Sequence, residues 1–175
     1  SLGTLLEAAD RLAGEGHDVA VDLVGGPDPD RNAEPSLRER ARALEGRVEV
    51  RFHGFQAEVE PFYRDADAFV LPSLSEGMSN ALLEALAHGL PCVVSGIPEN
   101  REVVDDGRTG LLFPVGDPGA LADRIARLIR DRRRGGALGR RLSGAAREEA
   151  RRRFSVDAVV DRLEAVYAEV TPGGA

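Results

Sequence analysis

The sequence predicts an α/β fold in which a doubly wound, Rossmann-like parallel sheet carries helices on both faces. Three observations support this class. Short apolar runs alternate along the chain with longer segments of helical periodicity. The runs are interpreted as uniformly apolar rather than alternating, as expected of strands that are buried on both faces. Gly or Pro residues close most of these runs, which is typical of the turns between such elements.

The first half of the chain alternates three predicted helices with three predicted strands. Gly14 ends the first helix, and a polar loop follows the first strand over Pro27–Pro35. Ser36, with Glu39 three residues later, forms a capping-box pattern for the second helix. The elements predicted here are a helix over Leu2–Ala13, a strand over Val19–Val24, a helix over Leu37–Leu44, a strand over Val48–His53, a helix over Val59–Asp65 and a strand over Ala68–Leu71.

The second half continues the alternation and ends in helices. Gly89 is expected to stop the first helix of this half at His88, and Ser155 to cap the last one. The remaining predictions are a strand over Cys92–Ser95, a helical turn over Glu102–Val104, a strand over Thr109–Phe113, helices over Pro118–Arg130, Leu138–Phe154 and Val156–Val170, and a frayed "TPGGA" end.

Composition narrows the function classes. The 175 residues carry 42% hydrophobic and 30% charged residues, which fits one globular domain without a membrane-spanning helix. A net charge of −7 argues against wholesale nucleic-acid binding. All 23 basic residues are arginine, so lysine chemistry is excluded. The single cysteine, Cys92, lies in an apolar run and reads as a buried, inert thiol.

The segment "SEGMSNALLEALAHG" joins the third predicted strand to the next helix. In open parallel sheets, ligands bind at the carboxyl ends of strands, against helix N-termini that favour phosphate. Gly77 allows close approach of the backbone, and Ser79 or Asn80 can cap the helix. Glu76 and Glu84 would lie about 12 Å apart along the axis, at ~1.5 Å per residue. This arrangement suits a nucleoside diphosphate sugar, with the ribose toward Glu84 and the sugar toward Glu76.

Each glutamate also has a simpler interpretation. Glu84 alone would be a solvated residue on a helix surface, and Glu76 a loop charge that is favoured by the helix dipole. A spacing of eight residues between glutamates is common. The pair gains weight from its setting, in which strand, Pro-Ser, Glu-Gly, helix, Gly-Leu-Pro and strand follow one another.

The run "LPSLSEGMSNALLEALAHGLPCVVSGIPENREVVDDGRTGLLFPVGDPGAL" resembles the donor-binding half of retaining glycosyltransferases with the GT-B fold, in family 4 or glycosyltransferase group 1. The resemblance extends upstream through "VDLVGGPD" and "VRFHGF". It implies the C-terminal half of a GT-B fold. The implied enzyme is a hexosyltransferase of polysaccharide biosynthesis, which moves a sugar from a nucleoside diphosphate sugar to an acceptor hydroxyl on a glycan or lipid.

The resemblance also implies roles for single residues. Glu76 would contact the donor sugar as the catalytic residue, and Glu84 would contact the ribose hydroxyls. Phe55 would stack on the nucleobase, although a core position that closes the sheet is an equal alternative. The other implied donor-binding residues lie at the helix start and in the loop after the second strand: Ser75, Gly77, Met78, Ser79, Asn80 and Ala81, with Gly54 and Gln56.

The chain departs from the family pattern at its start. Family members carry an Arg and a Lys just before a segment like "SLGTLLEAA", and this chain begins in that segment. We therefore expect both basic residues, the first strand and the N-terminal acceptor domain to be missing. Residues 1–154 would form a truncated nucleotide-sugar-binding domain, and residues 155–175 a helix that crosses back to the acceptor domain, with a frayed tail. Weak nucleotide binding and no useful turnover are expected of the isolated chain.

No cofactor and no metal are expected, because the implied transfer is metal-independent. The expected partners are a nucleotide sugar and the acceptor domain, with peripheral membrane association through that domain, and no nucleic acid. The expected location is the cytoplasm, including the inner face of the membrane. Two alternatives stay open: a non-catalytic nucleotide-binding or scaffold module of the same fold, and an enzyme like a sugar-nucleotide epimerase. The base, the sugar and the acceptor are not predicted.

Overall fold

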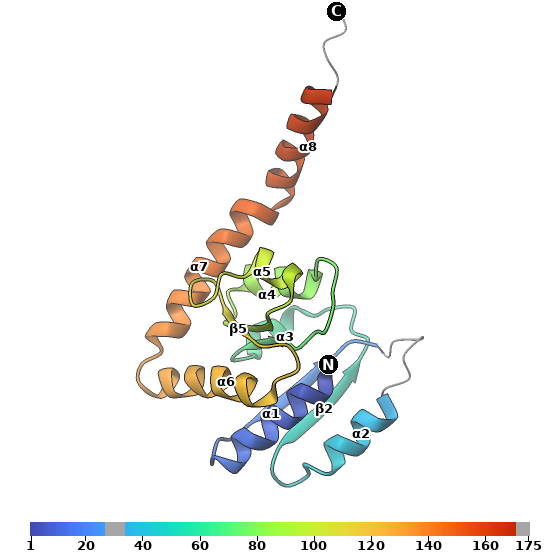
Figure 1. Cartoon of the computed structure of the whole chain (residues 1–175), viewed down its shortest axis with the longest axis vertical. Coiled ribbons are helices and arrows are strands. Elements are labelled where there is room, and N and C mark those ends of the chain that lie inside the picture. Colours follow the sequence, from blue (N-terminus) through green and yellow to red (C-terminus); the bar gives the residue numbers. More distant parts are fainter. Residues whose placement is uncertain (27–33, 171–175) are drawn as a thin grey trace, which may run out of the picture.

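The computed structural model describes residues 1–26 and 34–170 (Figure 1). Five strands alternate with helices in these ranges. The strands are β1 (Ala20–Val24), β2 (Glu49–Gly54), β3 (Phe69–Leu71), β4 (Cys92–Ser95) and β5 (Leu111–Phe113). The helices are α1 (Leu2–Gly14), α2 (Glu34–Arg42), α3 (Glu60–Asp65), α4 (Asn80–His88), α5 (Pro98–Val103), α6 (Pro118–Arg133), α7 (Ala137–Phe154) and α8 (Val156–Val170).

All pairing between the described strands is parallel, which confirms the α/β class. The strands form two sheets rather than one, β1–β2 and β3–β4–β5. In the second sheet, β4 and β5 match the expectation of burial on both faces, because each of their residues is buried, while the residues of β3 are half-buried. The first sheet does not, because Asp22 of β1 and Glu49 of β2 are exposed and form ion pairs with Arg51.

The core lies on both sides of β4, as the doubly wound arrangement requires. Val93 packs in one cluster with α1 and α6, while Cys92 and Val94 pack in the other with α4. This alternation follows from the two-residue period of a strand. The prediction that Cys92 is a buried thiol is confirmed, and burial raises the pKa of this thiol well above its ordinary value.

Two predicted helix starts are wrong for the same reason. The second helix begins at Glu34 rather than Leu37, so Ser36 lies inside the first turn and not at the cap. The turn expected over Glu102–Val104 is the end of a helix that begins at Pro98. Proline suits the first turn of a helix because the backbone N–H that it lacks has no partner there. Residues 27–33 of the predicted loop and the "TPGGA" end lie outside the described residues.

The last described helix, α8, projects from the body of the molecule and continues the direction of α7 (Figure 1). Ser155 caps this helix as predicted, because its Oγ accepts from the N–H of Ala158 at 3.2 Å. Across the 15 described positions of α8, no side chain is buried. Its large apolar side chains are exposed: Val156, Val159, Val160, Leu163, Val166, Tyr167 and Val170.

Candidate functional site

The predicted site forms at the carboxyl end of β3, where the chain turns into α4. Ser79 is the N-cap of this helix, and its Oγ accepts from the N–H of Leu82 at 3.3 Å. Within residues 1–26 and 34–170, the N–H groups of Asn80 and Ala81 donate to no protein acceptor. A helix N-terminus with free N–H groups and a positive dipole end favours an anion.

Glu76 lies in the loop before α4 and is half-buried. The Oγ of Ser73 donates to its Oε1 at 2.5 Å, which leaves Oε2 without a bond to the described residues. The backbone nitrogen of Ser1 lies 2.7 Å from the carbonyl oxygen of Pro72, so the start of α1 lies beside the loop that carries Glu76.

Glu84 is exposed on α4, but it is not simply solvated. The Oη of Tyr63 donates to Glu84 Oε2 at 3.0 Å and also contacts the carbonyl of Ala81 at 3.3 Å. The Tyr63 ring stacks on His88 with 5.2 Å between the ring centroids. Glu84 is therefore held by a residue of α3 that the sequence reasoning missed.

The loop over Gly54, Phe55 and Gln56 lies beside the turn that follows β1, because the N–H of Gly25 donates to the carbonyl of Gly54 at 2.9 Å. Gly54 has a φ of +65°, which favours glycine. Gln56 holds its own loop by donating to the carbonyl of His53 at 2.8 Å. The Phe55 side chain is 81% exposed, so the alternative that placed it in the core is wrong.

Helix α3 lies between the two predicted parts of the site, which are the loop that begins at Gly54 and the segment that carries the two glutamates. The His53 ring, next to the Gly54 loop, packs edge-on against Phe62 with 4.7 Å between centroids. The next residue, Tyr63, bonds to Glu84. Met78 adds an exposed apolar side chain between the glutamates in sequence, with 61% of its surface accessible.

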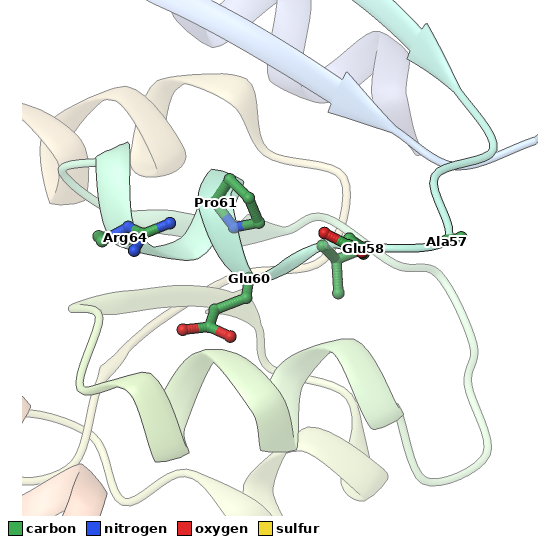
Figure 2. A pocket seen from close by; sticks show the side chains of 6 residues that line it. Ala57, Glu58, Glu60, Pro61 and Arg64 are labelled. Atoms are coloured by element: carbon green, nitrogen blue, oxygen red, sulfur yellow. The ribbon is translucent and has the colours of Figure 1, made fainter.

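A hollow of about 400 Å³ lies next to the loop over Gly54, Phe55 and Gln56 rather than at the glutamates. It is lined by Ala57, Glu58, Val59, Glu60, Pro61 and Arg64, along the segment that enters α3 (Figure 2). None of these six residues was predicted to bind a ligand.

The described residues show neither a metal cluster nor a membrane span. Within residues 1–26 and 34–170, no three His, Cys, Asp or Glu side chains gather as metal ligands would. Asp67, one of the two acids before β3, forms an ion pair with Arg132. In the same ranges, each helix is too short or too polar to cross a bilayer. Metal-independent transfer stays a prediction.

A parallel sheet that is wound on both faces, with a polar cluster where a strand runs into a helix N-terminus, defines the Rossmann-like class of ligand-binding domain. The sequence assigns the chain to one family within this class. Residues 1–131 match the family described as glycosyl transferases group 1, and the chain belongs to this family.

A relative and two solved structures illustrate the match. The chain is 32% identical over 158 residues to the lipopolysaccharide core biosynthesis glycosyltransferase LpsE of Rhizobium meliloti, covering 90% of this chain and 43% of LpsE. Anabaena HepE, solved with UDP and glucose, superposes with a TM-score of 0.82 at 23% identity, covering 95% of this chain and 44% of HepE. The C-terminal domain of LpcC from Francisella tularensis superposes with a TM-score of 0.73 at 21% identity, covering 87% of this chain and 78% of that domain.

These likenesses confirm the predicted fold as that of the C-terminal domain of GT-B glycosyltransferases. The chain spans less than half of LpsE and of HepE. It therefore corresponds to a domain of such enzymes and not to their whole length.

Sequence reasoning missed the side chains that hold the glutamates. Tyr63 and Ser73 bond to the glutamates directly, while Ser95 bonds to the backbone of Ser73 and Asn100 bonds to Ser95. Ser73 and Ser95 lie at the ends of the apolar runs of β3 and β4. A polar side chain next to a buried run was the available signal, because such a group needs a hydrogen-bond partner.

Proposed function

We propose that this chain is the donor-binding domain of a retaining glycosyltransferase, which moves a sugar from a nucleoside diphosphate sugar to an acceptor hydroxyl on a glycan or lipid. The observation that carries the proposal is the placement of Glu76 and Glu84 on either side of the free N–H groups at the start of α4. Family membership and the solved relative bound to UDP support it.

The diphosphate would bind at the N-terminus of α4. The N–H groups of Asn80 and Ala81 are available to phosphate oxygens, and a Cβ atom at Gly77 would meet no atom within 4 Å beyond the neighbouring residues. Charge that develops on the leaving diphosphate would be stabilised by these fixed donors. The start of α1 lies beside Pro72, so basic residues placed just before α1 would reach the same phosphates.

The ribose and the sugar would each meet one glutamate. Glu84 presents Oε1 to the ribose hydroxyls while Tyr63 occupies Oε2. Glu76 presents Oε2 to the sugar while Ser73 occupies Oε1. Carboxylates accept strong hydrogen bonds from hydroxyl groups. Glu76 would therefore orient the sugar for transfer, which is the role proposed for it as the catalytic residue. The exposed ring of Phe55 would stack on the base, beside Gly54 and Gln56.

The acceptor would be bound by a second domain. We infer that residues 1–154 form the donor domain and that the exposed apolar side chains of α8 pack against the acceptor domain. Donor and acceptor must be oriented together for transfer, so the isolated chain should bind donor weakly and turn over little.

The proposal is tested by ligand-observed NMR with UDP, GDP and ADP at millimolar concentration. We expect one nucleotide to bind and Glu84→Gln to weaken it about tenfold, the effect of losing a charged hydrogen bond. The matched control is Glu164→Gln, which changes an exposed glutamate of α8 and should leave binding unchanged. Equal binding by Glu84→Gln and wild type would contradict the proposal.

A further inference from the structure

Three buried polar side chains form a continuous run that ends at Glu76. Asn100 is 1% exposed, Ser95 is 0% exposed and Ser73 is 9% exposed. Asn100 lies in α5, Ser95 ends β4, and Ser73 lies in the loop after β3. The run therefore connects three separate parts of the fold to one carboxylate.

The hydrogen bonds have a consistent direction. Asn100 Nδ2 donates to the carbonyl of Ser95 at 2.9 Å and to its Oγ at 3.3 Å. With an acceptor site of Ser95 Oγ occupied, its proton goes to the carbonyl of Ser73 at 2.6 Å. Ser73 Oγ then donates to Glu76 Oε1 at 2.5 Å. Ser95 thus holds the backbone of Ser73, and the side chain of Ser73 holds the carboxylate.

Burial explains why these groups are bonded, but not why the run ends at Glu76. A buried polar group without a partner is strongly unfavourable, so Ser95 and Asn100 require some acceptor or donor. A glutamate side chain loses much of its rotamer freedom when it is ordered. The bond from Ser73 orders Glu76 before any ligand arrives and leaves Oε2 for that ligand.

We propose that Ser73, Ser95 and Asn100 are positioning residues that hold Glu76 for the donor sugar. The inference rests on the proposed function, in which Glu76 contacts the sugar and Glu84 the ribose. None of the three needs to touch the ligand, because each acts through the next residue toward Glu76.

The test compares affinities of the 175-residue chain for UDP and UDP-glucose, or for the matching pair if another base binds. Ser95→Ala is expected to weaken UDP-glucose binding about fivefold and to change UDP binding by less than twofold. Ser95→Thr keeps the hydroxyl and should restore wild-type affinity. In a Glu76→Ala background, Ser95→Ala should have no further effect, because the side chain through which it acts is gone.

Thr109→Val is the matched control, since Thr109 is 1% exposed and its Oγ1 accepts from the N–H of Asp105, away from Glu76. This variant should leave the ratio of the two affinities unchanged. The inference is overturned if Ser95→Ala keeps the wild-type ratio, if it weakens both ligands equally, or if wild type binds both equally. If Ser95→Ala does not fold, Ser73→Ala carries the same expectation. A folded wild type that binds neither ligand overturns the proposed function as well.

Discussion

The phenolic Oη of Tyr63 donates a 3.0 Å hydrogen bond to Oε2 of Glu84, across 21 residues of sequence. Burial raises the pKa of the Tyr63 phenol, and the bond to Glu84 raises it further, so the phenol stays a neutral donor near neutral pH. The bond directs one carboxylate oxygen toward α3 and leaves the other for a ligand.

Tyr63→Phe should therefore weaken nucleotide binding. We expect about a fivefold loss for the nucleoside diphosphate, because the change removes one hydrogen bond that orders Glu84 while keeping the ring on His88. Isothermal titration calorimetry with the variant measures this loss of affinity. Tyr167→Phe, on the exposed face of α8, is the control and should bind as wild type does. An unchanged affinity in Tyr63→Phe would show that Glu84 needs no support from α3.

Phe55→Ala should separate a binding role from a packing role. Because the ring is 81% exposed, its removal should change the free energy of unfolding by less than about 0.5 kcal/mol. Loss of stacking on a base is worth about 1–3 kcal/mol of binding free energy. Chemical denaturation and nucleotide titration measure the two effects. A loss of several kcal/mol in stability with unchanged binding would contradict the assignment.

Glu149 should make the stability of the chain depend on pH. Burial of this carboxyl acts to raise its pKa, but hydrogen bonds from Arg152 and Arg108 outweigh burial and hold the pKa below its ordinary value of 4.5. A carboxyl whose pKa is lowered in the folded state stabilises the fold at any pH above its ordinary pKa. That stabilisation is lost as the pH falls through the lowered pKa. Glu149→Gln should therefore be less stable than wild type at pH 7, and the difference should shrink below about pH 4. Urea unfolding between pH 7 and pH 3 measures the difference. A stability difference that does not vary with pH would show that the ionised Glu149 carboxylate does not stabilise the fold.

Removal of residues 155–175 should leave the core intact. Because no described side chain of α8 is buried, we expect the free energy of unfolding to change by less than about 1 kcal/mol. For comparison, Leu142→Ala in α7 should cost about 2–5 kcal/mol, since Leu142 is 0% exposed. Denaturant unfolding of both variants provides the measurement. A large loss on removal of residues 155–175 would place α8 within the domain instead.

Local signals in the sequence were enough for much of the fold. Ser79 and Gly89 lie at the two ends of α4 as their residue types predicted, since caps depend on neighbouring residues. The capping-box pattern at Ser36 does not mark the start of α2, because Pro35 suits the first turn of the helix and the helix begins at Glu34. The division of the strands into two sheets also had no local signal, because strand pairing depends on distant segments.

The sequence predicted the residues of the candidate site that would contact a ligand, but not the side chains that hold those residues in place. Glu76 and Glu84 could be selected because they flank a helix start within one short segment. Glu84 is held by Tyr63, 21 residues before it, and Ser73, which holds Glu76, is itself held through its carbonyl by Ser95, 22 residues further on. Hydrogen bonds between distant residues leave no periodic pattern in a sequence, so these contacts required the structure.

Titration of the ¹⁵N-labelled chain with UDP, GDP and ADP, followed by amide chemical shifts, tests the location of the proposed donor site most directly. The account predicts that one nucleotide shifts the amides of Asn80 and Ala81 most, together with those of Gly54 and Phe55. Shifts confined to the hollow between Ala57 and Arg64, or the absence of shifts with all three nucleotides in a folded chain, would contradict it.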